Sequence, residues 1–207
     1  MIVNRYRYIE QLSRSKNNGL IKIITGLRRS GKSFLLKKLF HQHLLDEGVR
    51  EDHILVIDME SRKNREFKNP DYLLDWVEKM MIDYETYYII IDEVQEVEDF
   101  VEVLSSLSVT EGADVYVTGS NSRFLSSDLV TEFRGRGDEI HVWPLSFKEF
   151  MTVYDGSKED GWAEYRLYGG LPQLLTQVGD EKKADFLIPD YQRPYAWGEK
   201  ECQTLWD

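Results

Sequence analysis

Residues 26–33 constrain the fold of this chain more than any other segment. They read Gly26-Leu27-Arg28-Arg29-Ser30-Gly31-Lys32-Ser33, which matches the pattern G-x-x-x-x-G-K-[ST]. The pattern follows a β-rich run and precedes a segment with helical spacing, which is the context it requires. Its glycines let the backbone bend so that N–H groups point at bound phosphates. The segment predicts a phosphate-binding loop between a strand and a helix; the alternative is a glycine-rich turn with a solvated lysine.

Five short β-rich runs predict the strands of one sheet. Several are nearly continuous apolar runs, which is typical of strands buried on both faces of a parallel sheet. The runs are Leu20–Thr25, His53–Asp58, Tyr87–Ile91, Asp114–Thr118 and Glu139–Trp143.

Segments with helical features lie between and after these runs. Apolar residues repeat at helical spacing in Ser33–Leu45, Tyr72–Met81 and Phe100–Leu107. Asn69 is a capping residue before a proline at the first helical position, and Ser146 with Glu149 forms a capping box. The alternation of strand and helix predicts an α/β fold, a three-layer sandwich with a five-stranded parallel sheet and right-handed crossovers.

Composition limits the class of protein. The 207 residues are 42% hydrophobic and 30% charged, which predicts a packed globular core. No apolar run approaches the ~18 residues of a membrane span, and no apolar stretch follows Arg5 and Arg7. The single cysteine, Cys202, excludes an internal disulfide, so we expect a cytoplasmic location.

The net charge of −11 argues against a surface broadly adapted to nucleic acid. A local basic cluster is nevertheless present within residues 28–38, and a phosphate ligand or a nucleic acid explains it equally well. The cluster comprises Arg28, Arg29, Lys32, Lys37 and Lys38.

Two acids follow the third apolar run. Because the carboxyl ends of parallel strands face the ligand crevice, Asp92 and Glu93 are expected near the loop at 26–33. Asp92 would then hold Mg²⁺ through water, and Glu93 would polarise an attacking water. In the loop itself, Lys32 would reach the β- and γ-phosphates and the Ser33 hydroxyl would bind Mg²⁺. The alternative for the two acids is the start of a solvated loop.

Two further segments offer candidate residues. Ser120 or Asn121, after the fourth run, is placed to hydrogen-bond the γ-phosphate or the attacking water; an ordinary strand exit is the alternative. Arg134 and Arg136 lie beside glycines, and Arg136 is the better candidate for an arginine that completes a neighbouring subunit's site. A helix cap or a local ion pair explains these arginines equally well.

The histidines carry no recognisable metal signature. None has a cysteine or an acid at metal-ligand spacing along the chain, so we expect ordinary solvated or hydrogen-bonded side chains. The four are His41, His43, His53 and His141.

An ordered series of motifs resembles a known family. It comprises Gly26–Ser33, Ile91–Gln95, Thr118–Asn121, Gly135-Arg136, Pro144–Phe150 and Tyr168–Pro172. Over residues 1–175 the series is similar to the prokaryotic AAA+-type ATPases of the archaeal-ATPase group. The resemblance implies ATP and Mg²⁺ as ligands, Walker A at Gly26–Ser33, Walker B at Asp92 and Glu93, sensor 1 at Asn121 and a possible arginine finger at Arg136.

The resemblance also implies a division of the chain. Residues 1–145 would form the ATPase core and 146–175 a truncated helical lid, followed by a linker at 176–184. Residues 185–207 resemble the opening of the ParB-like domain of type IV restriction enzymes, although the aromatic residues there are also compatible with packing against the core. No catalytic residue is carried over for this segment.

The expected function is Mg²⁺-dependent ATP hydrolysis in a homo-oligomer, or with a partner protein that completes the site. A different class of function stays open: a nucleotide-dependent switch or scaffold that hydrolyses ATP slowly. The tail suggests a third, a component of nucleic-acid-directed defence, which the acidic net charge does not favour. No membrane partner is expected.

Overall fold

The structure, a computed structural model, describes residues 2–119 and 137–176. The chain divides into two compact units, the first ending at Pro144 and the second beginning at Leu145. No helix in the part of the chain that is described is both long enough and apolar enough to cross a membrane.

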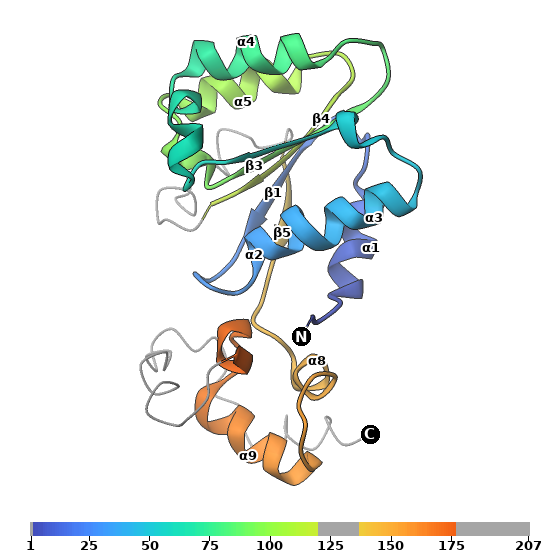
Figure 1. Ribbon diagram of the computed structural model, residues 1–207, viewed down its shortest axis with the longest axis vertical. Helices are drawn as coiled ribbons and strands as arrows, with labels where there is room; N and C mark the ends of the chain where they lie inside the picture. The colour runs from blue at the N-terminus through green and yellow to red at the C-terminus, as the bar shows by residue number, and fades with distance from the viewer. Residues whose placement is uncertain (1, 120–136, 177–207) are drawn as a thin grey trace. The chain divides into compact units, whose positions relative to one another are not determined.

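The first unit alternates strands and helices as the sequence predicts (Figure 1). Its strands are β1 (Ile21–Thr25), β2 (Ile54–Asp58), β3 (Tyr87–Asp92), β4 (Ala113–Thr118) and β5 (Gly137–His141). Its α-helices are α1 (Tyr6–Arg14), α2 (Lys32–Phe34), α3 (His41–Asp46), α4 (Pro70–Met80) and α5 (Phe100–Ser108). Segments of 3-10 helix cover Glu51–His53, Arg62–Lys68 and Val94–Glu96.

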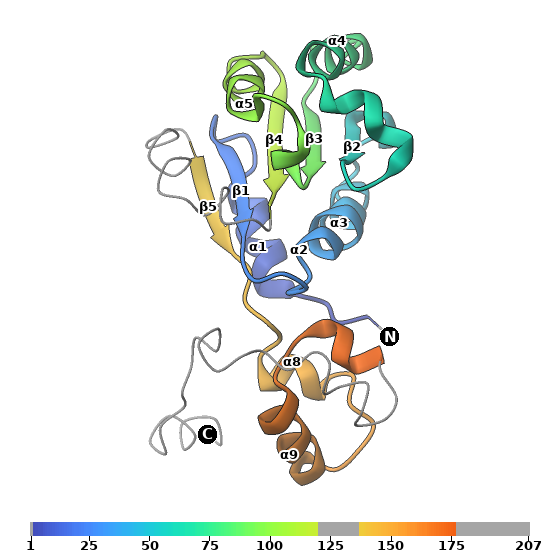
Figure 2. The ribbon, with the colours of Figure 1, turned by 90° about the vertical axis from the view of Figure 1, so that its left-hand side faces the viewer.

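The five strands form one parallel sheet in the order β2-β3-β4-β1-β5 (Figure 2). The predicted five-stranded parallel sheet is therefore confirmed. Because all strands run the same way, the loop after β1 and the residues after β2, β3 and β4 lie at one edge of the sheet. That edge is where α/β proteins bind ligands.

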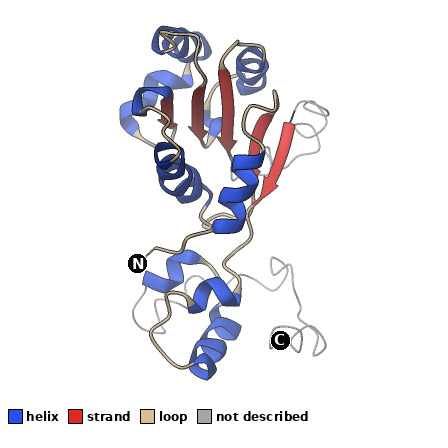
Figure 3. Ribbon diagram, turned by 90° about the vertical axis from the view of Figure 1, so that its right-hand side faces the viewer, coloured by secondary structure: helices blue, strands red, loops and turns tan. Residues whose placement is uncertain are grey.

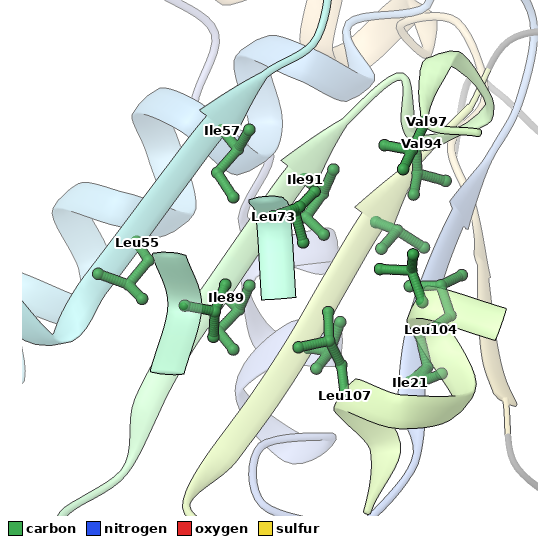
Figure 4. Close-up of a cluster of buried hydrophobic side chains, with 14 of the residues drawn as sticks. Ile21, Leu55, Ile57, Leu73, Ile89, Ile91, Val94, Val97, Leu104 and Leu107 are labelled. Carbon is green, nitrogen blue, oxygen red and sulfur yellow. The ribbon is translucent and has the colours of Figure 1, made fainter. Parts of the chain in front are cut away.

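Helices cover both faces of the sheet, as Figure 3 shows. On one face, α4 and α5 supply Leu73, Val77, Leu104 and Leu107 to a cluster that also takes in Ile89 and Ile91 (Figure 4). On the other face, α1 and the helix after β1 pack against alternate residues of the same strands. That cluster includes Leu12, Leu36, Phe40, Leu44, Ile24, Ile90 and Ile140. Strand residues buried on both faces explain the continuous apolar runs in the sequence.

β5 begins and ends two residues earlier than the predicted run at 139–143. It pairs with β1 from Gly137 opposite Ile21 to His141 opposite Thr25. Beyond Thr25 the partner chain segment turns away at Gly26, so β5 has no strand to continue against. Past the end of β5, the Val142 N–H still donates to the Thr25 carbonyl of β1 at 2.8 Å.

The helix after β1 is longer and less regular than predicted. It runs from Lys32 to Asp46, with a π-helical stretch over Leu35–Phe40 between α2 and α3. α4 is capped as predicted, since the Asn69 side chain accepts a hydrogen bond from the Tyr72 N–H at 2.9 Å. Short π-helical stretches inside helices are frequent at functional sites.

The described part of the second unit holds α8 (Phe147–Met151), α9 (Lys158–Tyr168) and a 3-10 turn at Pro172–Thr176. The capping box of Ser146 and Glu149 is present at the start of α8. Gly170 meets Leu145, whose N–H donates to the Gly170 carbonyl at 2.7 Å. A Cβ at Gly170 would lie 2.1 Å from the Leu145 carbonyl oxygen, so only glycine fits there.

Candidate functional site

The loop at residues 26–33 curls tightly between β1 and α2. Gly26 has φ +135°, and a Cβ there would lie 2.2 Å from the Val142 carbonyl oxygen. Arg29 and Gly31 also have positive φ, and Gly31 directly precedes α2. These left-handed residues turn the loop back on itself, a conformation that lets successive backbone N–H groups form an anion-binding concavity. The predicted loop between strand and helix is confirmed.

Lys32 reaches across this loop. Its side chain is only 4% exposed, and its ammonium donates to the Gly26 and Leu27 carbonyl oxygens at 3.0 Å each. Burial lowers the pKa of Lys32, and the carboxylates of Glu93 and Asp92 partly oppose that shift. The ammonium therefore lies inside the loop on neutral acceptors, where phosphate oxygens would be stronger acceptors.

Ser30 adds a buried hydroxyl to the same loop. Its Oγ is fully buried and has no hydrogen-bond partner among the residues described. Arg28 and Arg29, by contrast, are exposed on the outside of the loop. A buried hydroxyl without a partner costs free energy, so an anionic ligand in the loop would satisfy a group that the protein leaves unpaired.

Asp92 lies at the end of β3, almost completely buried, with one carboxylate oxygen hydrogen-bonded and the other in an ion pair. Oδ1 accepts the Thr118 hydroxyl at 2.6 Å, and Oδ2 lies 2.6 Å from the Lys37 ammonium. The same ammonium lies 2.7 Å from Asp58 Oδ2, at the end of β2. Two neighbours from different elements therefore fix the orientation of the Asp92 carboxylate.

The sequence reasoning gave neither Lys37 nor Thr118 a role. Lys37 belongs to the basic cluster of residues 28–38 and lies in the π-helical stretch. Its ammonium pairs with the carboxylates of Asp58 and Asp92. Burial alone would lower the pKa of Lys37, yet hydrogen bonds and charge from Asp58 and Asp92 outweigh it and raise the pKa. Two signals were available: Lys37 follows Ser33 by one helical turn, and Thr118 ends a strand beside β3.

Glu93 follows in a strained backbone conformation. Its φ and ψ are 57° and 53°, the left-handed region that is costly for residues other than glycine. Its N–H donates to the Thr118 hydroxyl oxygen at 3.0 Å, and its Oε2 accepts from Gln95 Nε2 at 2.5 Å. Thr118 therefore links both acids of the predicted pair, and Glu93 is held at 9% exposure beside the loop edge.

The predicted residues divide into three groups. The structure brings Gly26, Ser30, Lys32, Asp92 and Glu93 to one edge of the sheet. Ser33 is half-buried in the first turn of α2, with Arg28 and Arg29 exposed nearby. Asn121 and Arg136 lie outside the described residues, as do Ser120 and Arg134.

The donor set suits a magnesium nucleotide. Hard oxygen ligands are what Mg²⁺ prefers, and the Ser33 hydroxyl and the Asp92 carboxylate offer them. The unpartnered Ser30 hydroxyl and the Lys32 ammonium suit phosphate oxygens. The residues present therefore fit both groups.

Arg5 supports the loop from outside, a role that no local sequence pattern indicates. Its guanidinium donates to the Ser30 carbonyl oxygen at 3.3 Å and to the Trp143 carbonyl oxygen at 2.7 Å. It also stacks over the Tyr8 ring at 4.6 Å, and the Tyr8 hydroxyl accepts from the Trp143 N–H. The segment before α1 thus ties the loop to the chain leaving β5.

Replacing Arg5 by alanine is expected to lower the free energy of unfolding by about 1.5–3 kcal/mol, the usual worth of hydrogen bonds from a charged group. The two carbonyls lose a charged donor, and the loop loses a support. Urea denaturation followed by tryptophan fluorescence measures the change. Arg7→Ala is the matched control, because Arg7 is exposed two residues away; equal loss in both variants would contradict the assignment.

A family model described as an AAA domain matches residues 18–151. An uncharacterised protein of Haemophilus influenzae is 35% identical over 193 residues, covering 90% of this chain and 48% of the relative. An uncharacterised protein of Methanocaldococcus jannaschii is 25% identical over 187 residues, covering 83% of this chain and 40% of the relative. The chain thus spans half or less of the length of these curated relatives.

Solved structures are similar at low sequence identity. PCH-2 of C. elegans is 15% identical with a TM-score of 0.48, covering 96% of this chain and 52% of that chain. A DNA polymerase III gamma subunit-related protein of Thermotoga maritima is 16% identical with a TM-score of 0.48, covering 82% and 54%.

Proposed function

The chain belongs to a family of AAA domains, and from this premise we propose that it binds ATP with Mg²⁺ and hydrolyses the nucleotide. One observation carries the proposal. The Lys32 ammonium is buried in the loop after β1, and Asp92 and Glu93 are buried where β3 ends, at the same edge of one parallel sheet. Phosphoryl transfer needs cationic charge on the phosphates, a metal ligand and an acceptor for the proton of the attacking water.

Each residue has a proposed part. Lys32 exchanges the carbonyls of Gly26 and Leu27 for phosphate oxygens. The Ser33 hydroxyl and Asp92 would hold Mg²⁺, which when bound neutralises charge on the phosphate oxygens. Glu93 accepts the proton of the attacking water.

Several supporting features position those residues. Thr118 and Lys37 keep the Asp92 carboxylate oriented, and the Thr118 hydroxyl also receives the Glu93 N–H. Asn121 is proposed to orient the water or the γ-phosphate. Arg136 is proposed to act in the site of a neighbouring subunit, which makes a homo-oligomer the expected working form.

The division of the chain into domains and its location are also proposals. Residues 1–145 would be the ATPase core and 146–175 part of a lid, in a protein of the cytoplasm. The likeness of residues 185–207 to a ParB-like domain stays a prediction, because that segment lies outside the described residues.

Replacing Lys32 by alanine tests the binding step. Loss of its charge-assisted hydrogen bonds is expected to weaken binding of a fluorescent ATP analogue about 10- to 100-fold, since each such bond is worth about 1.5–3 kcal/mol. Lys38→Ala is the matched control, because Lys38 is exposed on the same helix and carries the same charge. Equal affinity of the wild type and Lys32→Ala for the ATP analogue would contradict the proposed nucleotide site.

A second candidate function is a nucleotide-dependent switch with slow hydrolysis. The hydrogen bond from Gln95 favours it, because it occupies the carboxylate that would have to receive the proton. A switch retains bound ATP for hours, whereas an enzyme turns over many times in that period. Single-turnover measurement with radiolabelled ATP separates the two functions.

A further inference from the structure

A second cluster of titratable side chains lies at the opposite edge of the sheet. His53 precedes β2, and Asp83 and Glu85 precede β3, so all three belong to the amino-terminal ends of parallel strands. Asp58 and Asp92 lie at the carboxyl ends of those strands. Five residues at ~3.3 Å each place the two edges about 16 Å apart. The cluster is therefore independent of the proposed nucleotide site.

The His53 ring is buried and fixed in orientation. Its side chain is 3% exposed, and its ring stacks on Tyr87 with centroids 4.2 Å apart and an interplanar angle of 15°. Nδ1 lies 3.2 Å from the Thr86 carbonyl oxygen. A carbonyl only accepts, so Nδ1 carries a proton and Nε2 is the ring nitrogen left to bind a cation.

Nε2 faces a carboxylate without a hydrogen bond to it. Asp83 Oδ2 lies 3.2 Å away, yet Nε2 is buried and has no hydrogen-bond partner among the residues described. A lone pair on Nε2 and a carboxylate oxygen would repel each other at this distance, and either a proton on Nε2 or a bound cation would remove that repulsion. Two ligand atoms of a tetrahedral zinc ion, each about 2.1 Å from the metal, are themselves roughly 3.4 Å apart.

Glu85 completes a set of three. One ligand atom from each of His53, Asp83 and Glu85 lies within 4.8 Å of the other two. Glu85 Oε2 is nearest to Nδ1, at 3.8 Å, so the exposed Glu85 side chain would turn toward Nε2 to bind the ion. An imidazole held through its other nitrogen by a backbone carbonyl is the usual arrangement of a metal-binding histidine.

The charge around the cluster is unbalanced. The Arg50 guanidinium donates to both carboxylate oxygens of Asp52, from Nε at 3.0 Å and from Nη2 at 2.8 Å. Its Nη1 lies 3.3 Å from Asp83 Oδ2 and 4.0 Å from Glu85 Oε2. With the His53 ring uncharged, three carboxylates against one guanidinium leave a charge of −2, which a divalent cation would neutralise. Arg50 alone does not offset these acids.

We propose that His53, Asp83 and Glu85 bind a divalent cation of the zinc type, with water completing its coordination. One imidazole with two carboxylates suits Zn²⁺, whereas Mg²⁺ prefers an all-oxygen set. The ion would join the start of β2 to the segment that enters β3. The spacing of histidines along the sequence did not predict this, because the two acids come about thirty residues after His53 and only the pairing of β2 with β3 brings them together.

The test is isothermal titration of ZnCl₂ into the full chain, prepared without a histidine tag, freed of metal by chelator and kept without nucleotide. One Zn²⁺ per chain is expected. His53→Ala and Glu85→Gln are each expected to weaken Zn²⁺ binding at least about tenfold. Loss of a residue that only hydrogen-bonds a metal ligand already lowers metal affinity about 10- to 100-fold, and these residues are proposed as direct ligands. Glu85 is 69% exposed, so its replacement leaves the fold intact should His53→Ala fail to fold.

Matched controls come from the same chain. His41→Ala removes another histidine that lies 3.2 Å from a carboxylate, that of Glu51, and Cys202→Ser removes the single thiol. Both are expected to bind Zn²⁺ as the wild type does. No heat at millimolar zinc, or equal affinity in wild type and Glu85→Gln, would overturn the proposal.

Discussion

Replacing Glu93 by glutamine is expected to lower the rate of ATP turnover at least about 100-fold, the usual contribution of a general base. The substitution keeps the shape of the side chain and removes only its charge and basicity. Because Lys32 and the loop at 26–33 are untouched, affinity for ATP should stay within about threefold of wild type. Steady-state phosphate release and binding of a fluorescent ATP analogue measure the two quantities separately.

Glu96→Gln is the matched control for this experiment. Glu96 lies three residues further on, is half-exposed and pairs with Lys68 at 2.7 Å. Its loss should leave turnover close to wild type. If Glu93→Gln turns over ATP at the wild-type rate, Glu93 is not the base, and its strained backbone needs another explanation.

Replacing Asp114 by alanine is expected to lower the free energy of unfolding by about 3–5 kcal/mol, the cost of leaving one member of a buried ion pair alone. Lys22 is fully buried on β1, and its ammonium pairs with the Asp114 carboxylate on β4. The second carboxylate oxygen accepts the Tyr116 hydroxyl at 2.9 Å and the Asn17 N–H at 3.1 Å. Burial and the nearby carboxylate raise the pKa of Tyr116, so its hydroxyl stays a donor.

Urea denaturation measures this loss, and two further variants locate its cause. Asp75→Ala removes an exposed acid on α4 and should change stability by no more than about 0.5 kcal/mol. The double variant Lys22→Met with Asp114→Leu removes both charges and should recover at least half of the loss, because no buried charge remains unpaired. A double variant as unstable as Asp114→Ala would show that the lost hydrogen bonds dominate, not the unpaired lysine.

Local sequence patterns were enough to predict the parallel sheet and the loop at residues 26–33. Apolar runs mark strands buried on both faces, and residues 26–33 need a strand before them and a helix after them. The ends of β5 could not be read in this way, because they depend on where its neighbour β1 turns away at Gly26.

The supporting residues of the site escaped prediction for a related reason. Arg5, Lys37 and Thr118 act through contacts with residues 21 or more positions away, and their own segments have no distinctive sequence pattern. Asp92 and Glu93 were found because two acids at a strand end form a local pattern. For Asn121 and Arg136, the sequence prediction still awaits a test.

The most direct test of the central claim is phosphate release by the purified chain at saturating ATP, with Mg²⁺ or with EDTA, over a range of protein concentrations. The account predicts Mg²⁺-dependent release that is lost in Lys32→Ala and Glu93→Gln. It also predicts that the rate per subunit rises with concentration as neighbouring subunits supply Arg136. ATP that stays bound and intact under all these conditions would contradict hydrolysis and favour the switch.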